Sequence, residues 1–357
     1  MRSPSCEAGE VPRHNFSGLR GTLETLEVSS VHLQTNMLGD PDRRQVAVYI
    51  PDEVAAARGP VPLFVALAPF TGSGLKLTAW QAFGESLPLR VDRLIAEGTM
   101  GPIVLAMPDA FTSLGGNQYL DTPVLGRWSS FIHEDLVPAL ERRYPAGASP
   151  ARRALFGRSS GGYGALVNAM KHPNFWGAVA SHSGDADFDL LYRSDLPKAA
   201  GALARFDGDP VAFISHLQQQ PKVDGKDFYA LMILAMAASY DPQPERPLGI
   251  QFPADVRTCA LDVESWERWR RWDPLVLAED PDCVAALGSL KSLFIDCGSK
   301  DQYNLHFGNR RLSDTLRRGG VEHVYEEFPD GHSGVDYRLD RSLPLLYAAL
   351  LEDTPAT

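Results

Sequence analysis

The N-terminal part of the chain contains two kinds of strand pattern. Residues Leu23–Leu33 and Arg44–Ile50 alternate apolar and polar side chains, which is typical of antiparallel strands with one buried face. Residues Leu63–Ala68 and Ile103–Met107 are instead apolar on both faces. Continuous apolar strands are typical of a parallel sheet covered by helices on both sides, so we predict an antiparallel edge followed by a parallel sheet.

Strand and helix patterns alternate along most of the remaining chain. Apolar spacing predicts helices over 85–97, 130–143, 161–171, 305–318 and 339–351, and further strands over 154–157, 178–181, 290–297 and 323–328. Between about residues 186 and 286 this alternation stops, and the sequence becomes helical and irregular. We therefore expect a doubly wound, mostly parallel α/β sheet with a cap-like helical insertion over the carboxyl edge of its strands, where such sheets bind ligands.

Composition and charge narrow the class of protein. The 357 residues are 44% hydrophobic and 22% charged, as in soluble globular proteins, and no apolar run reaches membrane-spanning length. The formal net charge of −11 disfavours binding to nucleic acid or to an anionic membrane. We expect residues 1–20 to form a disordered leader that lacks a signal-peptide pattern, residues 21–357 to form one domain, and the location to be cytoplasmic. The four cysteines lack metal-binding spacing, so free thiols and no metal are expected.

A candidate nucleophile lies in the segment Ala154–Leu166. Gly157, Ser159 and Gly161 form a G-x-S-x-G pattern between an apolar strand and a helix. A serine in such a sharp turn needs small neighbours, because the backbone passes close to the elements around it. A chain with 31 glycines can match the pentapeptide by chance, but the strand before it and the helix after it favour Ser159 as a nucleophile.

A nucleophilic serine requires a base and an acid that orients the base, here expected in the chain order Ser, Asp, His. Asp301 follows the strand that ends at Cys297, and His332 follows the final strand, so both are expected at the same sheet edge as Ser159. For Asp301 the alternative is a loop aspartate that caps the next helix. Four other residues are less well placed for this chemistry: Asp296, Asp330, His306 and His323.

Two backbone amides are expected to stabilise the oxyanion that forms during attack on an ester. One is the amide of Ser160, at the start of the helix after the nucleophile. The other should come from the loop 69–74, with Phe70 as first choice and Thr71 next, although an ordinary glycine-rich turn explains this loop almost as well. Thr71 and His182 are also candidates for substrate contact, and for His182 a purely structural role is the alternative.

With these residues in place, the chain resembles the putative esterase family of α/β-hydrolases, which includes esterase D, enterochelin esterase and the antigen 85 mycolyltransferases. The resemblance runs from about Val28 to the C-terminus. It rests on Met107–Asp109, Trp128–Tyr144, Gly157–Leu166, His172-Pro173 with Phe175, Ser181–Gly184, Gly298–Asp301 and Gly331–Ser333.

The resemblance implies an α/β-hydrolase fold, hydrolysis of a small carboxylic ester through an acyl-enzyme, and no cofactor. It implies that Ser159, Asp301 and His332 form the catalytic triad. It also suggests that Tyr119 and Trp128 line the substrate pocket, with plain core packing as an equal alternative. Many members carry His-Gly where this chain has Ala68-Pro69, which leaves the second oxyanion donor open.

Two other functions are compatible with the same sequence features. An acyltransferase would use the same three residues, with an alcohol in place of water as the acceptor of the acyl group. The second function is that of a binding protein, in which a catalytically inactive hydrolase fold only binds a ligand. The intact order of serine, aspartate and histidine disfavours this function.

Overall fold

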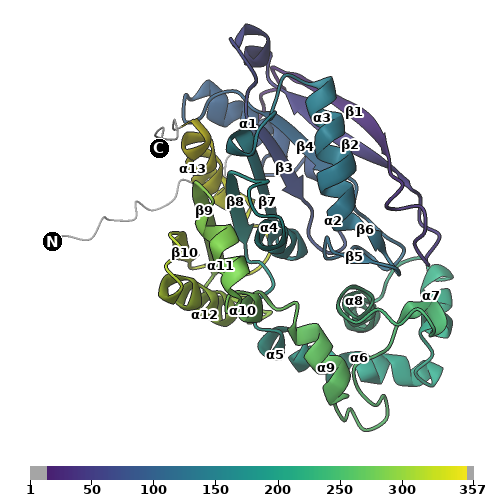
Figure 1. Cartoon of the computed structure of the whole chain (residues 1–357). Coiled ribbons are helices and arrows are strands. Elements are labelled where there is room, and N and C mark those ends of the chain that lie inside the picture. The colour runs from purple at the N-terminus through teal and green to yellow at the C-terminus, as the bar shows by residue number, and fades with distance from the viewer. Residues whose placement is uncertain (1–13, 352–357) are drawn as a thin grey trace.

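An eight-stranded sheet forms the centre of the molecule, with the strand order β1-β2-β4-β3-β7-β8-β9-β10 (Figure 1). The computed structural model describes residues 14–351. The strands of this sheet are β1 (Thr22–Ser29), β2 (Arg43–Ile50), β3 (Leu63–Leu67), β4 (Val104–Pro108), β7 (Arg153–Arg158), β8 (Ala178–His182), β9 (Ser292–Gly298) and β10 (Val324–Phe328). Strand β2 is antiparallel to β1 and to β4, and all neighbouring pairs from β4 to β10 are parallel. The predicted antiparallel edge and parallel sheet are confirmed.

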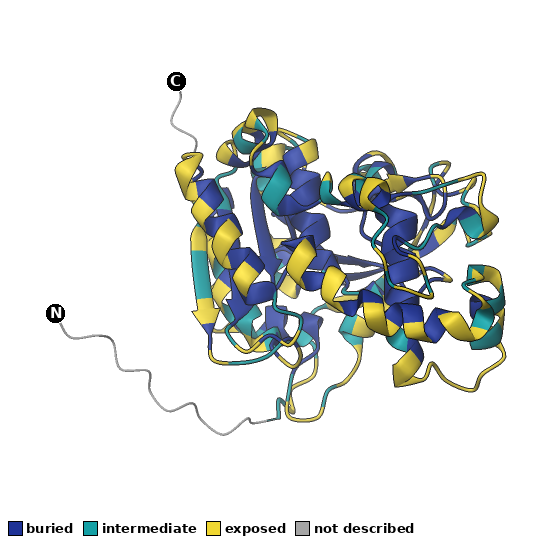
Figure 2. Cartoon of the chain, turned by 90° about the horizontal axis from the view of Figure 1, so that it is seen from below, coloured by how far each residue is buried: buried dark blue, intermediate teal, exposed yellow. Residues whose placement is uncertain are grey.

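The sheet separates two hydrophobic cores, as the strand patterns require. Along β3, Leu63, Val65 and Leu67 belong to one core, whereas Phe64 and Ala66 belong to the other. All five side chains are buried, because helices cover both faces of the sheet. Figure 2 shows the same arrangement as buried residues along the strands and on the inward sides of the helices.

The helices form a layer on each face of the sheet. One core includes apolar residues of α1 (Leu87–Ala96) and α13 (Leu339–Leu351). The other includes residues of α3 (Val137–Arg143), α4 (Ser160–Lys171), α11 (Pro281–Gly288) and α12 (Leu305–Arg318), and α3 and α4 lie in front of the sheet in Figure 1. These layers give the doubly wound, mostly parallel α/β fold that the sequence predicts.

The long helix expected over 130–143 is interrupted. The structure has a short α2 (Trp128–Ser130), a π-helical segment over Phe131–Leu136 and then α3. Pro138, near the start of α3, has no amide hydrogen to donate to an α-helical bond, which explains why the α pattern restarts there. A small antiparallel ribbon, β5 (Asp121–Thr122) with β6 (Gly126–Arg127), precedes this region and was not expected.

The segment between β8 and β9 is helical, and α6 to α9 lie beyond one end of the sheet, whereas its last helix, α11, lies in the layer on the sheet (Figure 1). Its helices are α5 (Phe188–Leu191), α6 (Leu196–Leu203), α7 (Pro210–Gln218), α8 (Gly225–Tyr240), α9 (Val263–Arg270), α10 (Pro274–Leu277) and α11. In α8 every residue from Ala230 to Tyr240 is buried, so this stretch of the helix is enclosed on all sides by its neighbours.

Other expectations about the chain meet the structure only in part. The expected leader falls mostly on residues 1–13, which lie outside the described residues, and Arg20 near its end hydrogen-bonds Asp92. Cys259, Cys283 and Cys297 are free thiols as expected, and Cys6 lies outside the described residues.

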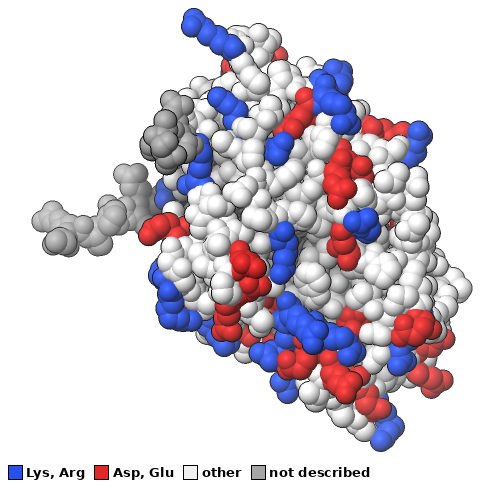
Figure 3. Space-filling model, in the orientation of Figure 1, with Lys and Arg blue, Asp and Glu red and all other residues white. Residues whose placement is uncertain are grey.

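Within residues 14–351, none of the helices is both long and apolar enough to cross a membrane. On the face in Figure 3, basic and acidic side chains are interspersed, so the acidic excess is not gathered in one patch there.

Candidate active site

Ser159 occupies a strained turn between β7 and α4. Its backbone angles are φ 56° and ψ −125°, a conformation that non-glycine residues rarely adopt. The turn is held because the Ser159 amide donates to the carbonyl of His182 at 2.9 Å, and the Ser159 carbonyl accepts from the amide of Tyr163 at 2.8 Å. A Cβ atom at Gly161 would lie 2.1 Å from the carbonyl oxygen of Leu67, so only glycine fits there. The predicted need for small neighbours around Ser159 therefore has a direct steric basis.

Asp301 and His332 form a buried hydrogen-bonded pair. Nδ1 of His332 lies 2.7 Å from Oδ2 of Asp301, and the two residues are 8% and 3% exposed. The other carboxylate oxygen of Asp301 accepts the amide of Tyr303 at 2.8 Å, and the Tyr303 ring packs edge-on against the imidazole. The Arg158 side chain donates to the backbone carbonyl of His332 at 3.0 Å. Both side chains are thus fixed in place by several contacts.

A cavity of about 510 Å³ brings most of the predicted site residues together. Its walls include Ser159, Ser160 and His332, together with Phe70 and Thr71 from the loop after β3. Asp301 lies behind His332 and is not part of the wall, as expected of a residue that orients the base. Because β3, β7, β8 and β9 are parallel, the loops after these strands meet at one edge of the sheet.

The backbone around the cavity distinguishes between the two candidates for the second oxyanion donor. The amide of Thr71 donates to the carbonyl of Gly115 at 2.7 Å and is therefore occupied. Within the described part of the chain, the amide of Phe70 has no such partner. Ser160 is the first residue of α4, where backbone amides lack partners inside the helix. Phe70 and Ser160 are thus the better-placed pair of donors.

The structure gives His182 a structural environment. Its Nδ1 lies 2.8 Å from Oδ1 of Asp296, and its Nε2 lies 2.9 Å from the hydroxyl of Ser342. Asp296 also accepts from Arg338 at 2.9 Å, which completes a buried charged network. His182 borders the cavity, and both of its ring nitrogens have partners within the protein, which favours the structural role over substrate contact.

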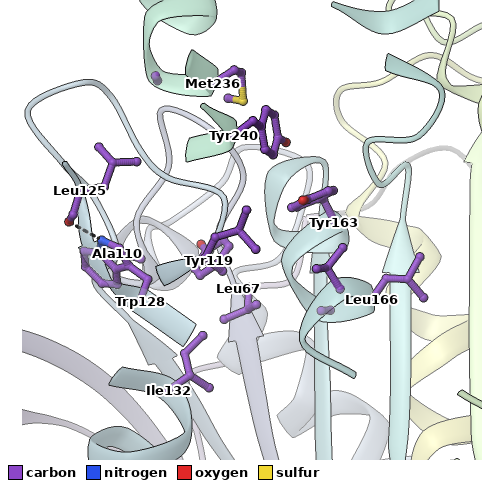
Figure 4. Close-up of a cluster of buried hydrophobic side chains, with 14 of the residues drawn as sticks. Leu67, Ala110, Tyr119, Leu125, Trp128, Ile132, Tyr163, Leu166, Met236 and Tyr240 are labelled. Atoms are coloured by element: carbon purple, nitrogen blue, oxygen red, sulfur yellow. Dashed lines mark hydrogen bonds between the residues drawn. The ribbon is translucent and has the colours of Figure 1, made fainter. Parts of the chain in front are cut away.

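Tyr119 and Trp128 belong to the core and do not line the cavity, which corrects the expectation of a pocket role (Figure 4). The Tyr119 hydroxyl donates to the carbonyl of Ala68 at 2.7 Å, and the Trp128 indole donates to the carbonyl of Leu125 at 2.9 Å. Both side chains are at most 2% exposed. Their polar atoms are satisfied by backbone groups, which leaves nothing to present to a substrate.

Several cavity residues could not be assigned from the sequence. Phe228, Met232 and Met236 line the cavity from one face of α8, where residues four apart lie above one another. Asp185 and Tyr192 line it from the segment after β8. A signal for Asp185 existed, because it closes the run His182-Ser183-Gly184-Asp185 after a parallel strand, at the edge that carries the site.

Asp185 is a titratable group on the cavity wall whose acidity is strongly altered. It is 5% exposed, and burial raises the pKa of its carboxyl to about 6. The Tyr192 hydroxyl, which donates to Oδ2 of Asp185 at 2.5 Å, acts in the opposite direction, as does the nearby charge of His332. A strongly altered pKa at the wall of a cavity is a frequent mark of a functional residue.

Comparison with known families identifies the chain. The model of the family described as "Putative esterase" matches residues 41–340, a range that contains Ser159, Asp301 and His332. The chain belongs to this esterase family. The resemblance that the motifs indicated is therefore confirmed.

Curated relatives match a shorter part of the chain. Esterase Rv1288 of Mycobacterium tuberculosis strain H37Rv is 33% identical over 99 residues, which are 25% of this chain and 21% of that protein. Esterase MT1326 of strain CDC 1551 matches with the same values. The matched region of this chain spans about a fifth of the length of these relatives.

Solved structures of similar fold cover nearly the whole chain. A ferulic acid esterase superposes with a TM-score of 0.59 at 18% identity and covers 93% of this chain and 100% of its own. An S-formylglutathione hydrolase from Agrobacterium tumefaciens gives 0.55 at 16% identity, covering 95% and 98%. The enterobactin esterase of Shigella flexneri gives 0.52 at 14% identity, covering 92% and 60%. At these identities the likeness establishes the α/β-hydrolase fold of the chain.

Proposed function

We propose that this member of the esterase family is a serine carboxylesterase with Ser159 as nucleophile, His332 as general base and Asp301 as the carboxylate that orients the base. The observation that carries the proposal is the buried Asp301–His332 pair beside the cavity that also exposes Ser159. Family membership supports the reaction type. The strained backbone of Ser159 supports its role, because such strain collects at catalytic positions.

The proposed reaction proceeds in two stages. Oγ of Ser159 attacks the ester carbonyl while Nε2 of His332 takes its proton, and Asp301 stabilises the imidazolium through Nδ1–H. The amides of Ser160 and Phe70 stabilise the negative charge that develops on the carbonyl oxygen. His332 then gives the proton to the leaving alcohol, and water, activated by the same histidine, releases the acid.

The decisive variant is Ser159→Ala. We expect kcat for p-nitrophenyl acetate to fall by on the order of 10⁴-fold or more, because the covalent route is lost and only binding and the oxyanion amides remain. Labelling by a fluorophosphonate probe should disappear at the same time. The matched control is Ser149→Ala, a serine that does not line the cavity and has no side-chain capping bond. If Ser159→Ala keeps wild-type turnover or labelling, Ser159 is not the nucleophile.

A further inference from the structure

Asp185 is a buried carboxylate on the cavity wall, and the proposed triad does not use it. It follows β8, the strand that neighbours the nucleophile's strand in the sheet, and is 5% exposed. Its donors are neutral: the Tyr192 hydroxyl, 2.5 Å from Oδ2, and the side chain of Gln118. Within residues 14–351, no lysine or arginine side chain forms an ion pair with it. A buried carboxylate without a cation is unusual, because its desolvation is not offset.

The other buried aspartates show how unusual this is. Each of them has a basic partner or several backbone amides as donors. The pairs are Asp92–Arg20, Asp187–Arg311, Asp195–Lys198, Asp227–Arg205, Asp241–Arg268, Asp296–Arg338 and Asp301–His332, and Asp273 accepts the amides of Asp187, Phe188 and Leu275. Asp185 alone among these buried aspartates lacks both kinds of partner, and it alone lines the cavity. The missing partner therefore has access from the cavity.

We propose that the preferred substrate supplies this partner: an ester that carries a cationic nitrogen, which binds against Asp185 while the ester carbonyl lies at Ser159. This inference rests on the proposed esterase function and adds the substrate class. An ammonium ion next to a desolvated carboxylate gains a strong charge interaction, which a neutral group of the same shape cannot make.

The composition of the cavity wall suits such a group. The wall includes the aromatic residues Tyr192, Phe228 and Tyr303, and aromatic rings attract cations. Met232 and Met236 add flexible apolar surface that adapts to the alkyl groups of an ammonium. None of these side chains carries a positive charge, so none of them takes the place of a cation at Asp185.

The basic groups of the cavity do not oppose this binding. Arg158 donates to the carbonyl of His332 and lies 3.9 Å from Asp336, so its charge is already compensated. Lys76 is exposed to solvent at the cavity wall, where water screens its charge. The imidazolium that forms on His332 during catalysis is paired with Asp301. Asp185 is therefore the charge in the cavity that remains open to a ligand.

The test compares two pairs of esters that differ only in charge. In the first pair the cation is in the leaving group: the thioester butyrylthiocholine and its neutral isostere, in which tert-butyl replaces trimethylammonium. In the second it is in the acyl half: the p-nitrophenyl ester of γ-(trimethylammonio)butyrate and the corresponding tert-butyl isostere. For at least one pair, wild-type kcat/KM should favour the cationic ester by about tenfold or more. Asp185→Asn, which keeps the size but removes the charge, should abolish that preference, so that kcat/KM for the cationic and the neutral ester of a pair differ by less than about threefold.

The control removes a different carboxylate from the same cavity. Asp336→Asn should change the ratio of cationic to neutral kcat/KM by less than about twofold, because Asp336 faces Arg158. A second measurement uses the wild-type enzyme alone: tetramethylammonium chloride should inhibit hydrolysis of the neutral ester competitively, beyond the effect of equal sodium chloride. An unchanged ratio in Asp185→Asn for both pairs, or no inhibition by tetramethylammonium, overturns the inference. If the wild type hydrolyses the neutral esters and Ser159→Ala does not, the esterase proposal still holds. Failure of the cationic-substrate inference can therefore be told apart from failure of the esterase proposal.

Discussion

Replacing Asp301 by asparagine tests the role of the acid without changing its size. In the native protein Oδ2 of Asp301 lies 2.7 Å from Nδ1 of His332, in a position that is 3% exposed. An asparagine can turn its NH₂ group toward Nδ1, which places the imidazole proton on Nε2, the atom that must accept the proton of Ser159. It also removes the charge that stabilises the imidazolium. Together these effects predict a fall in kcat on the order of 10⁴-fold, equivalent to about 5 kcal/mol of transition-state stabilisation.

The assay is the hydrolysis of p-nitrophenyl acetate by Asp301→Asn, with kcat and KM determined separately. KM should change by less than about threefold, because Asp301 does not line the cavity and the loss falls on the chemical step. Asp330→Asn is the matched control from the loop next to His332, since within residues 14–351 its side chain accepts only the amide of Gly331 and a long bond from Tyr337. If Asp301→Asn retains more than about a tenth of the wild-type kcat, the carboxylate does not orient or stabilise the base in the manner described.

Two further predictions concern stability. Asp296→Asn removes the buried charge that bonds both His182 and Arg338, although Arg338 keeps its ion pair with Glu326, so the free energy of unfolding in urea should fall by about 1–3 kcal/mol; an unchanged urea midpoint would contradict the role of this network. Burial raises the pKa of Asp185 to about 6, so the folded protein keeps a proton there that the unfolded chain has lost between about pH 4 and pH 6. The free energy of unfolding of the wild type should therefore decrease relative to Asp185→Asn as the pH rises through this range, by up to about 3 kcal/mol. The measurement is urea unfolding of both proteins at each pH. If the free energy of unfolding of the wild type, relative to that of Asp185→Asn, stays constant or increases with pH, Asp185 is not held in the buried environment described.

The elements of the sheet could be predicted because their signals are local. Every residue of the apolar run Leu63–Leu67 is buried, on both faces of the strand. A run of five apolar residues is too short for a typical buried helix and therefore indicates a strand in the interior of a parallel sheet. Helix α1 begins two residues later than predicted because Ser86, one residue after the predicted start, acts as its N-cap and accepts the amide of Leu89. The π-helical segment in the expected helix 130–143 has no signal in the apolar spacing, which is the same for both kinds of helix over so short a stretch.

The predicted placement of Ser159, Asp301 and His332 depended on topology more than on any one motif. Each follows a strand of the parallel sheet, and parallel strands deliver the residues after them to one edge whatever their separation in sequence. Tyr119 does not come directly after a strand of the parallel sheet, so its position could not be inferred in this way. The structure shows that its ring fills space against Gly164, where a Cβ atom would lie 2.4 Å from the ring. Close packing of that kind depends on two distant segments and leaves no periodic trace in the sequence.

The wall of the cavity formed by α8 and the residues after β8 is hard to predict for the same reason. The apolar residues of α8 are buried on all sides, so their pattern does not reveal which face borders a ligand. The state of Asp185 is harder still, because the partners of buried aspartates come from far along the chain: Asp187 pairs with Arg311, and Asp296 with Arg338. In the sequence Asp185 and Asp187 are two aspartates of one loop and carry no sign of their difference. The structure assigns a cation or a set of backbone amides to each of the other buried aspartates, and this comparison reveals that Asp185 has neither. Because Asp185 lies on the cavity wall, a bound ligand is the remaining source of a positive charge for it.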